Sequence, residues 1–199
     1  KKEKLQDLFG VELHSIHKTL GDYKLWDDVS FTQSTLAHKV YYSNFYNGFH
    51  SIYYKFIKNI VSKIVQIPFY FQQIPTFRLG LPEEKFVRSF HKDSDFNHLE
   101  YELNFNLGLS NYAEGNFFIE TYPNSNQFTH MKCPYGEIFS IDHIGCKHGA
   151  KTNTSNKTMV SIDFRLAIDE CYYLDQKEKK GNQTNFVIGQ YFSSELINA

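Results

Sequence analysis

The octapeptide MVSIDFRL, residues 159–166, alternates between apolar and mainly polar side chains over its whole length. Its even-numbered positions are all apolar, whereas its odd-numbered positions include Ser161, Asp163 and Arg165. Because successive side chains of a β-strand point to opposite faces, this pattern predicts a strand with one apolar face and one polar face. Residues 102–109 and 116–121 repeat the alternation, and the first of them carries Asn104 and Asn106 on its polar face.

The surrounding sequence predicts a sheet protein preceded by helices. Strands are expected over residues 69–73, 76–81, 87–91, 100–109, 116–121, 127–132, 137–142 and 158–168, with Gly, Pro and Asn between many of them. From Tyr42 to Val65 apolar residues recur at three- and four-residue steps, which predicts an amphipathic helix. The predicted fold class is mainly β with N-terminal helices: a double-stranded β-helix, or jelly roll, buttressed by that long amphipathic helix.

The polar faces of these strands allow two interpretations. In a half-buried antiparallel sheet, polar side chains usually face solvent. Here a long apolar helix must also cover a sheet, so the apolar faces can lie under the helix while the polar faces line a ligand-filled interior. The second interpretation accounts for both features.

Length and composition predict one folded domain. The 199 residues are 41% hydrophobic and 17% aromatic, which is typical of a globular protein. We expect a helical N-terminal region over 1–68, a jelly-roll core with the active site over 69–168, and a C-terminal extension over 169–199. The net charge of −1 and pI near 6.8 favour neither a nucleic-acid nor a membrane partner. A cytoplasmic protein with reduced cysteines is expected; a homodimer through the N-terminal helices is left open.

A metal-binding pattern follows the predicted strand 87–91. His91 and Asp93 are two residues apart, so on extended chain their side chains project from the same face. A histidine from a distant strand would complete a 2-His-1-carboxylate face, which suits Fe(II) and leaves three positions open for chemistry. His148 is the favoured third ligand, and His143 and His130 are the substitutes.

Two further features bear on this site. His98 and Glu100 form a competing pair with the same spacing as His91 and Asp93. Of the 21 basic residues only Arg78, Arg88 and Arg165 are arginines, which suggests that each serves where a planar, bidentate donor is needed. Arg165 lies on the strand that follows His148, where it can hold a carboxylate beside the metal.

The segments around these residues resemble a known enzyme family. They are FHKDSDFNH (90–98), ELNFNL (102–107), AEGN (113–116), ETYP (120–123), CKHG (146–149) and VSIDFR (160–165). Together they are similar to the Fe(II)/2-oxoglutarate-dependent dioxygenases, and most of all to the phytanoyl-CoA hydroxylase-like group with its streptomycin-biosynthesis-type branch. The resemblance covers roughly residues 76–168.

The resemblance implies a non-haem dioxygenase that uses Fe(II), 2-oxoglutarate and O2, releases succinate and CO2, and hydroxylates a small polar substrate. It implies His91, Asp93 and His148 as metal ligands. By position it also assigns 2-oxoglutarate binding to Arg165, Ser161 and Asn104, and substrate contacts to Arg78, Asn106, Asn116 and Glu120. Many relatives have an arginine where this chain has Met159, so Arg88 and Arg78 are alternative anchors for 2-oxoglutarate.

Two other functions fit parts of the sequence. A metal-dependent jelly-roll isomerase or epimerase would keep the metal ligands and need no anchor for 2-oxoglutarate. A metal-free carbohydrate-binding β-sandwich would leave His91 and Asp93 as surface residues. Arg165 disfavours the first alternative, whereas Met159 slightly favours it; in the second, the polar faces of the strands would face water.

Overall fold

A computed structural model describes residues 2–19, 35–84, 90–110, 117–168, 180–181 and 184–198. Its largest sheet has five antiparallel strands: β1 (Phe69–Phe71), β2 (Thr76–Gly80), β3 (Glu102–Gly108), β6 (Ile138–Ile141) and β8 (Met159–Ile168). The long strand β8 lies in the middle. It pairs with β3 along one edge and with β2 and β1 in turn along the other, and β6 pairs with the far edge of β3.

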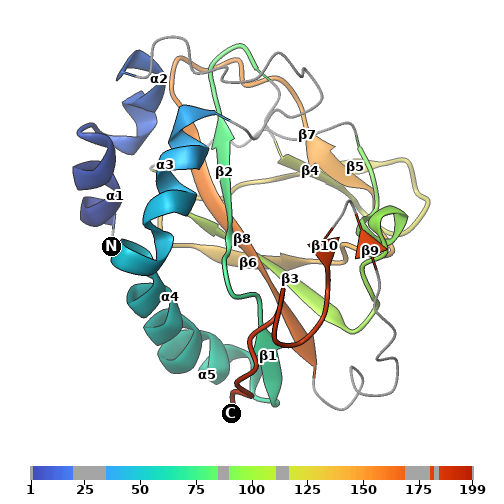
Figure 1. Ribbon diagram of the computed structural model, residues 1–199. Coiled ribbons are helices and arrows are strands. Elements are labelled where there is room, and N and C mark those ends of the chain that lie inside the picture. The colour runs from blue at the N-terminus through green and yellow to red at the C-terminus, as the bar shows by residue number, and fades with distance from the viewer. Residues whose placement is uncertain are drawn as a thin grey trace.

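A second, three-stranded antiparallel sheet has the order β5 (Phe128–Met131), β4 (Phe117–Glu120), β7 (His148–Ala150). It lies on the side of the large sheet away from the helices (Figure 1). The short strands β9 (Lys180–Gly181) and β10 (Thr184–Asn185) form a separate ribbon. The prediction of a mainly β protein with N-terminal helices is confirmed, and the sheets are antiparallel. Most of the predicted strand 87–91 lies outside the described residues.

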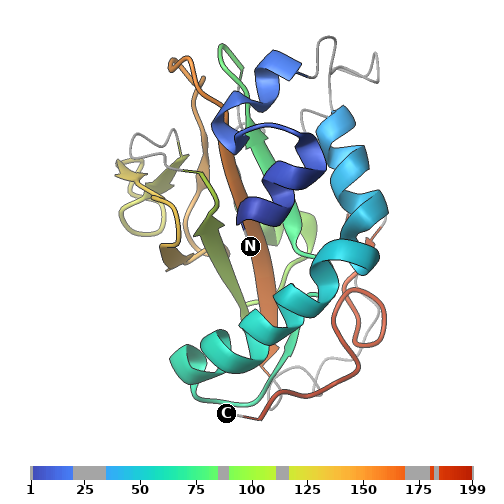
Figure 2. The same ribbon diagram turned by 90° about the vertical axis from the view of Figure 1, so that its left-hand side faces the viewer.

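The N-terminal helices cover the outer face of the large sheet (Figure 2). They begin with α1 (Lys2–Phe9), the 3-10 helix η1 (Leu13–Ser15) and α2 (Ile16–Thr19). In place of one α-helix over 42–65, the chain then forms five consecutive segments: α3 (Leu36–Asn44), the π-helix η2 (Phe45–Phe49), α4 (His50–Phe56), the π-helix η3 (Ile57–Val61) and α5 (Ser62–Val65). No described helix is both long and apolar enough to cross a bilayer.

The two π-helical turns change which side chains are buried. A regular helix would bury Ile60 and Ile64 on the same face as Phe45, yet they are 47% and 51% exposed. Ile57 and Val61 are buried instead. Each π turn closes with i→i+5 hydrogen bonds and so holds an extra residue, which rotates the apolar face relative to an α-helix.

The two faces of β8 serve different purposes. Its apolar row, which includes Phe164, belongs to the core between the sheet and the helices. Phe164 is fully buried and its ring contacts those of Tyr53, Phe56 and Phe105. The opposite row includes Asp163 and Arg165, which line a cavity between the two sheets. Polar side chains therefore face the interior on this strand, as the second interpretation of the sequence pattern required.

The start of α3 predicts an acid-sensitive contribution to stability. Nδ1 of His38 accepts a hydrogen bond from the Thr35 N–H at 3.2 Å, and burial, aided by the Arg78 guanidinium, lowers the pKa of His38 to about 4. Below pH 6.5 the unfolded chain takes up this proton first, so stability should fall by up to about 3 kcal/mol as the pH falls toward 4. Urea unfolding across this range measures the loss. His38→Gln should reduce the pH slope, and an unchanged slope would contradict the assignment.

Candidate metal centre

The backbone brings the predicted ligands together. His91 and His148 form an isolated antiparallel bridge, in which each N–H donates to the carbonyl of the other at 3.0 and 2.8 Å. Asp93 opens the 3-10 helix η4 (Asp93–Phe96), and its N–H donates to the His143 carbonyl at 2.8 Å. Lys92 between them is extended, with φ −103° and ψ 145°. The side chains of His91 and Asp93 therefore converge, as their spacing predicted.

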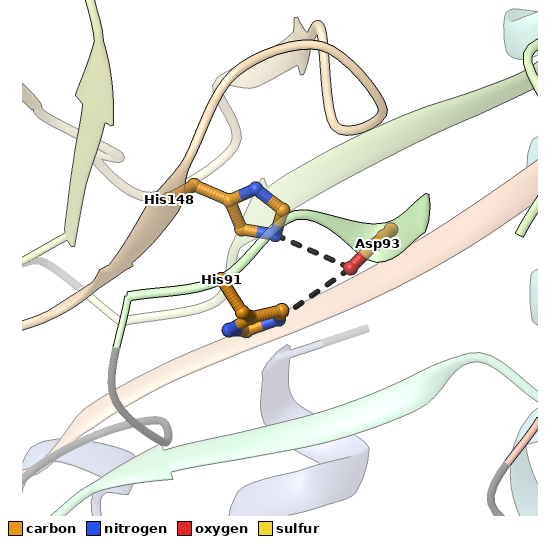
Figure 3. Close-up of side chains that lie close together, drawn as sticks. All are labelled: His91, Asp93 and His148. Atoms are coloured by element: carbon orange, nitrogen blue, oxygen red, sulfur yellow. Dashed lines mark ion pairs between the residues drawn. The ribbon is translucent and has the colours of Figure 1, made fainter. Parts of the chain in front are cut away.

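The three side chains point at one another (Figure 3). Oδ1 of Asp93 lies 3.5 Å from Nε2 of His91 and 3.3 Å from Nε2 of His148. One ligand atom from each residue can be chosen so that all lie within 4.8 Å of one another. Ligand atoms about 2.1 Å from an ion and at right angles to each other are about 3 Å apart. The spacing of these atoms is thus suitable for a single bound metal ion.

His148 presents the correct nitrogen to this point. Its Nδ1 lies 3.2 Å from the Cys146 carbonyl oxygen, which can only accept a hydrogen bond. Nδ1 therefore carries the proton, and Nε2 offers its lone pair toward Asp93. A backbone carbonyl that fixes the tautomer of a histidine is a common companion of metal ligation.

Gly149 permits the close approach of the two histidine segments, and this yields a prediction. A Cβ atom at this position would lie 3.1 Å from Cα and 3.2 Å from N of Phe90, which are backbone atoms. In Gly149→Ala the chain before His91 must move by a few tenths of an ångström, and we expect metal affinity to fall about tenfold. Gly48→Ala is the control, because its added Cβ meets nothing within 4 Å. Equal metal affinity in the two variants would contradict this role.

The second carboxylate oxygen of Asp93 is surrounded by donors. Oδ2 lies 2.5 Å from Nη2 of Arg165, 3.0 Å from Nδ1 of His143 and 3.4 Å from Nδ2 of Asn104. Burial alone would raise the pKa of Asp93, but the adjacent Arg165 guanidinium holds it far below its usual range. Asp93 is therefore ionised over the whole physiological range, as a metal ligand must be.

The charges around the centre leave room for a cation. Three carboxylates (Asp93, Glu102 and Asp163) lie near two guanidinium groups (Arg78 and Arg165), and all but Arg78 are buried. Counted without the histidines, these groups carry one negative charge in excess. Since an uncompensated buried charge is costly, a bound cation would stabilise the cluster.

The cavity beside the three ligands has a mixed lining, formed by Arg78, His91, Asp93, Asn104, Phe105, Asn106, Phe117, Phe139, Ile141, His148, Asp163 and Arg165. Five of the predicted site residues outside the metal triad fall in or next to it. Arg78, Asn104, Asn106 and Arg165 are lining residues, and Ser161 is on the same face of β8 as Arg165. Asn116 and Arg88 lie outside the described residues.

Several buried polar atoms of this region have no hydrogen-bond partner in the described part of the chain. They are Oδ1 of Asn104, Oγ of Ser161 and Nε of Arg165. Buried polar atoms in native proteins are nearly always paired with protein, water or ligand. Three unpaired atoms around one centre therefore indicate that a polar molecule belongs there.

Glu120 has a different position from the one predicted. Its carboxylate is buried and accepts hydrogen bonds from the Asn126 N–H at 3.0 Å and the Lys147 N–H at 2.8 Å. It is absent from the cavity lining and instead ties the turn after β4 to the segment before His148. Of the competing pair, His98 contacts Glu102 through Nδ1 at 2.6 Å, and neither His98 nor Glu100 belongs to the metal cluster of the described residues.

The sequence did not predict the contacts that two residues, His143 and Tyr191, make near the centre. His143 appeared there only as a substitute ligand, yet both its ring nitrogens face oxygens, those of Asp93 and of the Glu102 carbonyl. Tyr191 was not singled out, yet its hydroxyl accepts a hydrogen bond from Nη1 of Arg165 at 3.1 Å. No local pattern marks Tyr191, since it reaches the centre through the path of the C-terminal segment.

Comparison with known proteins gives one relative by sequence. The chain is 28% identical to the streptomycin biosynthesis protein StrG of Streptomyces griseus over 163 residues, which are 81% of this chain and 77% of that protein. No family model matches the chain.

Solved structures are similar only in part. The non-heme alpha-ketoglutarate-dependent carbocyclase SnoK from nogalamycin biosynthesis aligns with a TM-score of 0.47 and 12% identity, over 71% of this chain and 67% of SnoK. The nickel complex of the non-heme monooxygenase ThoJ aligns with a TM-score of 0.47 and 7% identity, over 84% of this chain and 70% of ThoJ. The chemistry of the centre therefore rests on its own residues.

Proposed function

We propose that the protein is an Fe(II)- and 2-oxoglutarate-dependent oxygenase that hydroxylates a small polar substrate. The observation that carries the proposal is the convergence of His91, Asp93 and His148 on one point at the edge of the cavity between the two sheets. Two imidazoles and one carboxylate suit Fe(II) and leave three coordination positions for other ligands. When bound, Fe(II) with 2-oxoglutarate and O2 supplies the oxidising power, and 2-oxoglutarate is converted to succinate and CO2.

The proposed fold is a double-stranded β-helix whose two layers are the five-stranded and three-stranded sheets. The large sheet supplies the residues of β2, β3 and β8 that line the cavity, and the small sheet supplies Phe117 and His148. In this arrangement the metal lies between the layers, and the helices support the large sheet from outside. The relative StrG, named for the biosynthesis of streptomycin, supports a small-molecule substrate.

The proposed binding site for 2-oxoglutarate uses the basic side of the cavity. Arg165 is the anchor expected by resemblance, but its Nη1 and Nη2 are taken by Tyr191 and Asp93. Arg78 lines the same cavity, and within the described residues it uses only Nε and Nη2, in its pair with Asp163 at 2.7 and 2.9 Å. We therefore propose Nη1 of Arg78 as the donor to the distal carboxylate.

Two neighbouring residues complete this site. Ser161 lies opposite Arg78 in the β2–β8 register, and its unpaired hydroxyl is the proposed second donor. Asn104 Oδ1 can only accept, so it is proposed to face a hydroxyl group or a water molecule rather than a carboxylate. The polar lining, with Asn106 beside Asn104, suits a substrate that carries hydroxyl or amide groups.

An anaerobic titration tests the proposal. The protein, freed of metal, is given Fe(II) and then 2-oxoglutarate, while the weak visible charge-transfer band of their chelate is monitored. We expect the band in the wild-type protein and its loss in Asp93→Ala. Iron binding without the band would instead favour a metal-dependent isomerase or epimerase, and no metal binding would reject both.

The same titration locates the anchor. Arg78→Leu should raise the 2-oxoglutarate concentration needed for half of the band by about tenfold or more, since a charge-assisted hydrogen bond is lost, while Fe(II) affinity changes little. The matched variant is Lys151→Leu, which removes a positive charge just after β7. Lys151 lies over the Phe118 ring and outside the cavity lining, so this variant should not change the titration. If the titration of Arg78→Leu is unchanged, Arg165 is the residue that binds the distal carboxylate of 2-oxoglutarate.

A further inference from the structure

The two oxygens of Asp93 have separate surroundings. Oδ1 faces Nε2 of His91 and Nε2 of His148, at 3.5 and 3.3 Å. Oδ2 faces the opposite way, toward Arg165, His143 and Asn104. The donors on Oδ2 leave Oδ1 as the oxygen directed at the metal position.

The Arg165 guanidinium is itself held in place. Nη2 contacts Asp93 and Nη1 donates to the Tyr191 hydroxyl at 3.1 Å, while Nε lies 4.0 Å from Oε2 of Glu102. Its backbone N–H donates to Oε1 of Gln72 at 3.1 Å. Both Nη groups therefore have a hydrogen-bond partner, and the orientation of Arg165 is set by Asp93, Tyr191 and its backbone contact with Gln72.

Tyr191 is equally well supported. Its ring packs against Phe186 and Phe192, with centroid distances of 4.7 and 4.9 Å, and its N–H donates to the Val187 carbonyl. Phe192 forms an isolated bridge with Gln72, which fastens this segment to the end of β1. Burial raises the pKa of Tyr191 to about 12, so its hydroxyl is intact at physiological pH.

We propose that Arg165, held by Tyr191 of the C-terminal segment, is a positioning residue that restricts Asp93 to coordination through Oδ1 alone. The inference rests on the proposed metal centre and goes beyond it. A carboxylate that bound through both oxygens would occupy a fourth position of an octahedral ion. Coordination through one oxygen leaves three positions, which is the number that a chelating co-substrate and O2 need.

Two conservative variants test this role. Tyr191→Phe keeps the ring and removes the hydroxyl that orients Arg165, and Arg165→Lys keeps the charge and removes the fork. Tyr46→Phe, at a tyrosine that is 61% exposed on the helical layer, is the matched control. Each protein, freed of metal, is titrated with Co(II), whose visible absorption reports its coordination number, after far-UV circular dichroism has shown that it is folded.

We expect Tyr191→Phe to weaken Co(II) binding by about tenfold and Arg165→Lys by more, as for other partners of metal ligands. We also expect both to change the intensity of the Co(II) bands, because Oδ2 becomes available to the ion, and Tyr46→Phe to change neither property. Wild-type affinity and spectra in both site variants would overturn the positioning role while leaving the metal centre intact. If the wild-type protein binds no Co(II), both the proposed metal centre and this inference are rejected.

Discussion

Replacement of His148 by alanine is expected to weaken metal binding on the order of a thousandfold while the protein remains folded. Protein metal sites with four ligands bind with roughly 10–16 kcal/mol, so each ligand accounts for several kcal/mol. His148 supplies the third ligand atom of the cluster, and its side chain hydrogen-bonds to the Cys146 carbonyl. The fold should therefore tolerate its loss better than the metal site does.

Electron paramagnetic resonance of free Mn(II) during a titration measures this affinity directly. The matched control is His130→Ala, because His130 lies on β5 of the same small sheet but belongs to no metal cluster of the described chain. The control should keep wild-type affinity. If His148→Ala also keeps it, the third ligand is another residue, and His143, which contacts the other oxygen of Asp93, is the first to test.

Replacement of Arg165 by methionine should lower the free energy of unfolding by about 3–5 kcal/mol. The side chains of Arg165 and Asp93 are 8% and 5% exposed, so the variant leaves a buried carboxylate without its strongest partner. Removal of one member of a buried ion pair typically costs this much, whereas removal of both costs far less. The double variant Arg165→Met, Asp93→Asn should therefore recover much of the loss.

Urea unfolding is measured for the wild-type protein, Arg165→Met, Asp93→Asn and the double variant. The four free energies of unfolding give the coupling energy between the two residues. We expect a coupling of about 2 kcal/mol or more, measured without metal so that ligand binding does not contribute. Additive losses in the double variant would show that Arg165 and Asp93 do not depend on each other. That result would also remove the physical basis of the positioning role.

The alternating pattern of β8 made the large sheet predictable. Side-chain alternation determines which face packs on the helices, so Phe164 and Arg165 could be assigned to opposite faces before the structure was known. The convergence of His91 and Asp93 was predictable for the same reason, because their two-residue spacing acts locally. Strand β7 was harder to recognise, since HGA at 148–150 is too short to show alternation.

Other features depend on contacts that no local pattern encodes. The two π turns shift the buried face from Ile60 to Ile57, and regular helical periodicity cannot reveal such a shift. The partners of Arg165 depend on where the C-terminal segment returns to the sheet, which places Tyr191 against a strand far away in the sequence. Glu120 lies outside the described cavity lining because it is on the face of β4 opposite Phe117, which lines the cavity.

The reciprocal hydrogen bonds between His91 and His148 have a consequence for dynamics. Two ligands of the proposed ion are joined by their own main chains, so neither can leave without opening this bridge. Among the described residues the bridge to His91 is a single pair, although His148 also lies in the β4–β7 ladder, and a single pair opens more readily than the interior of a sheet. Amide hydrogen exchange at His91 and His148 thus reports the local opening through which an ion would enter or escape. A bound ion would slow that exchange, because it would also link the two residues through their side chains.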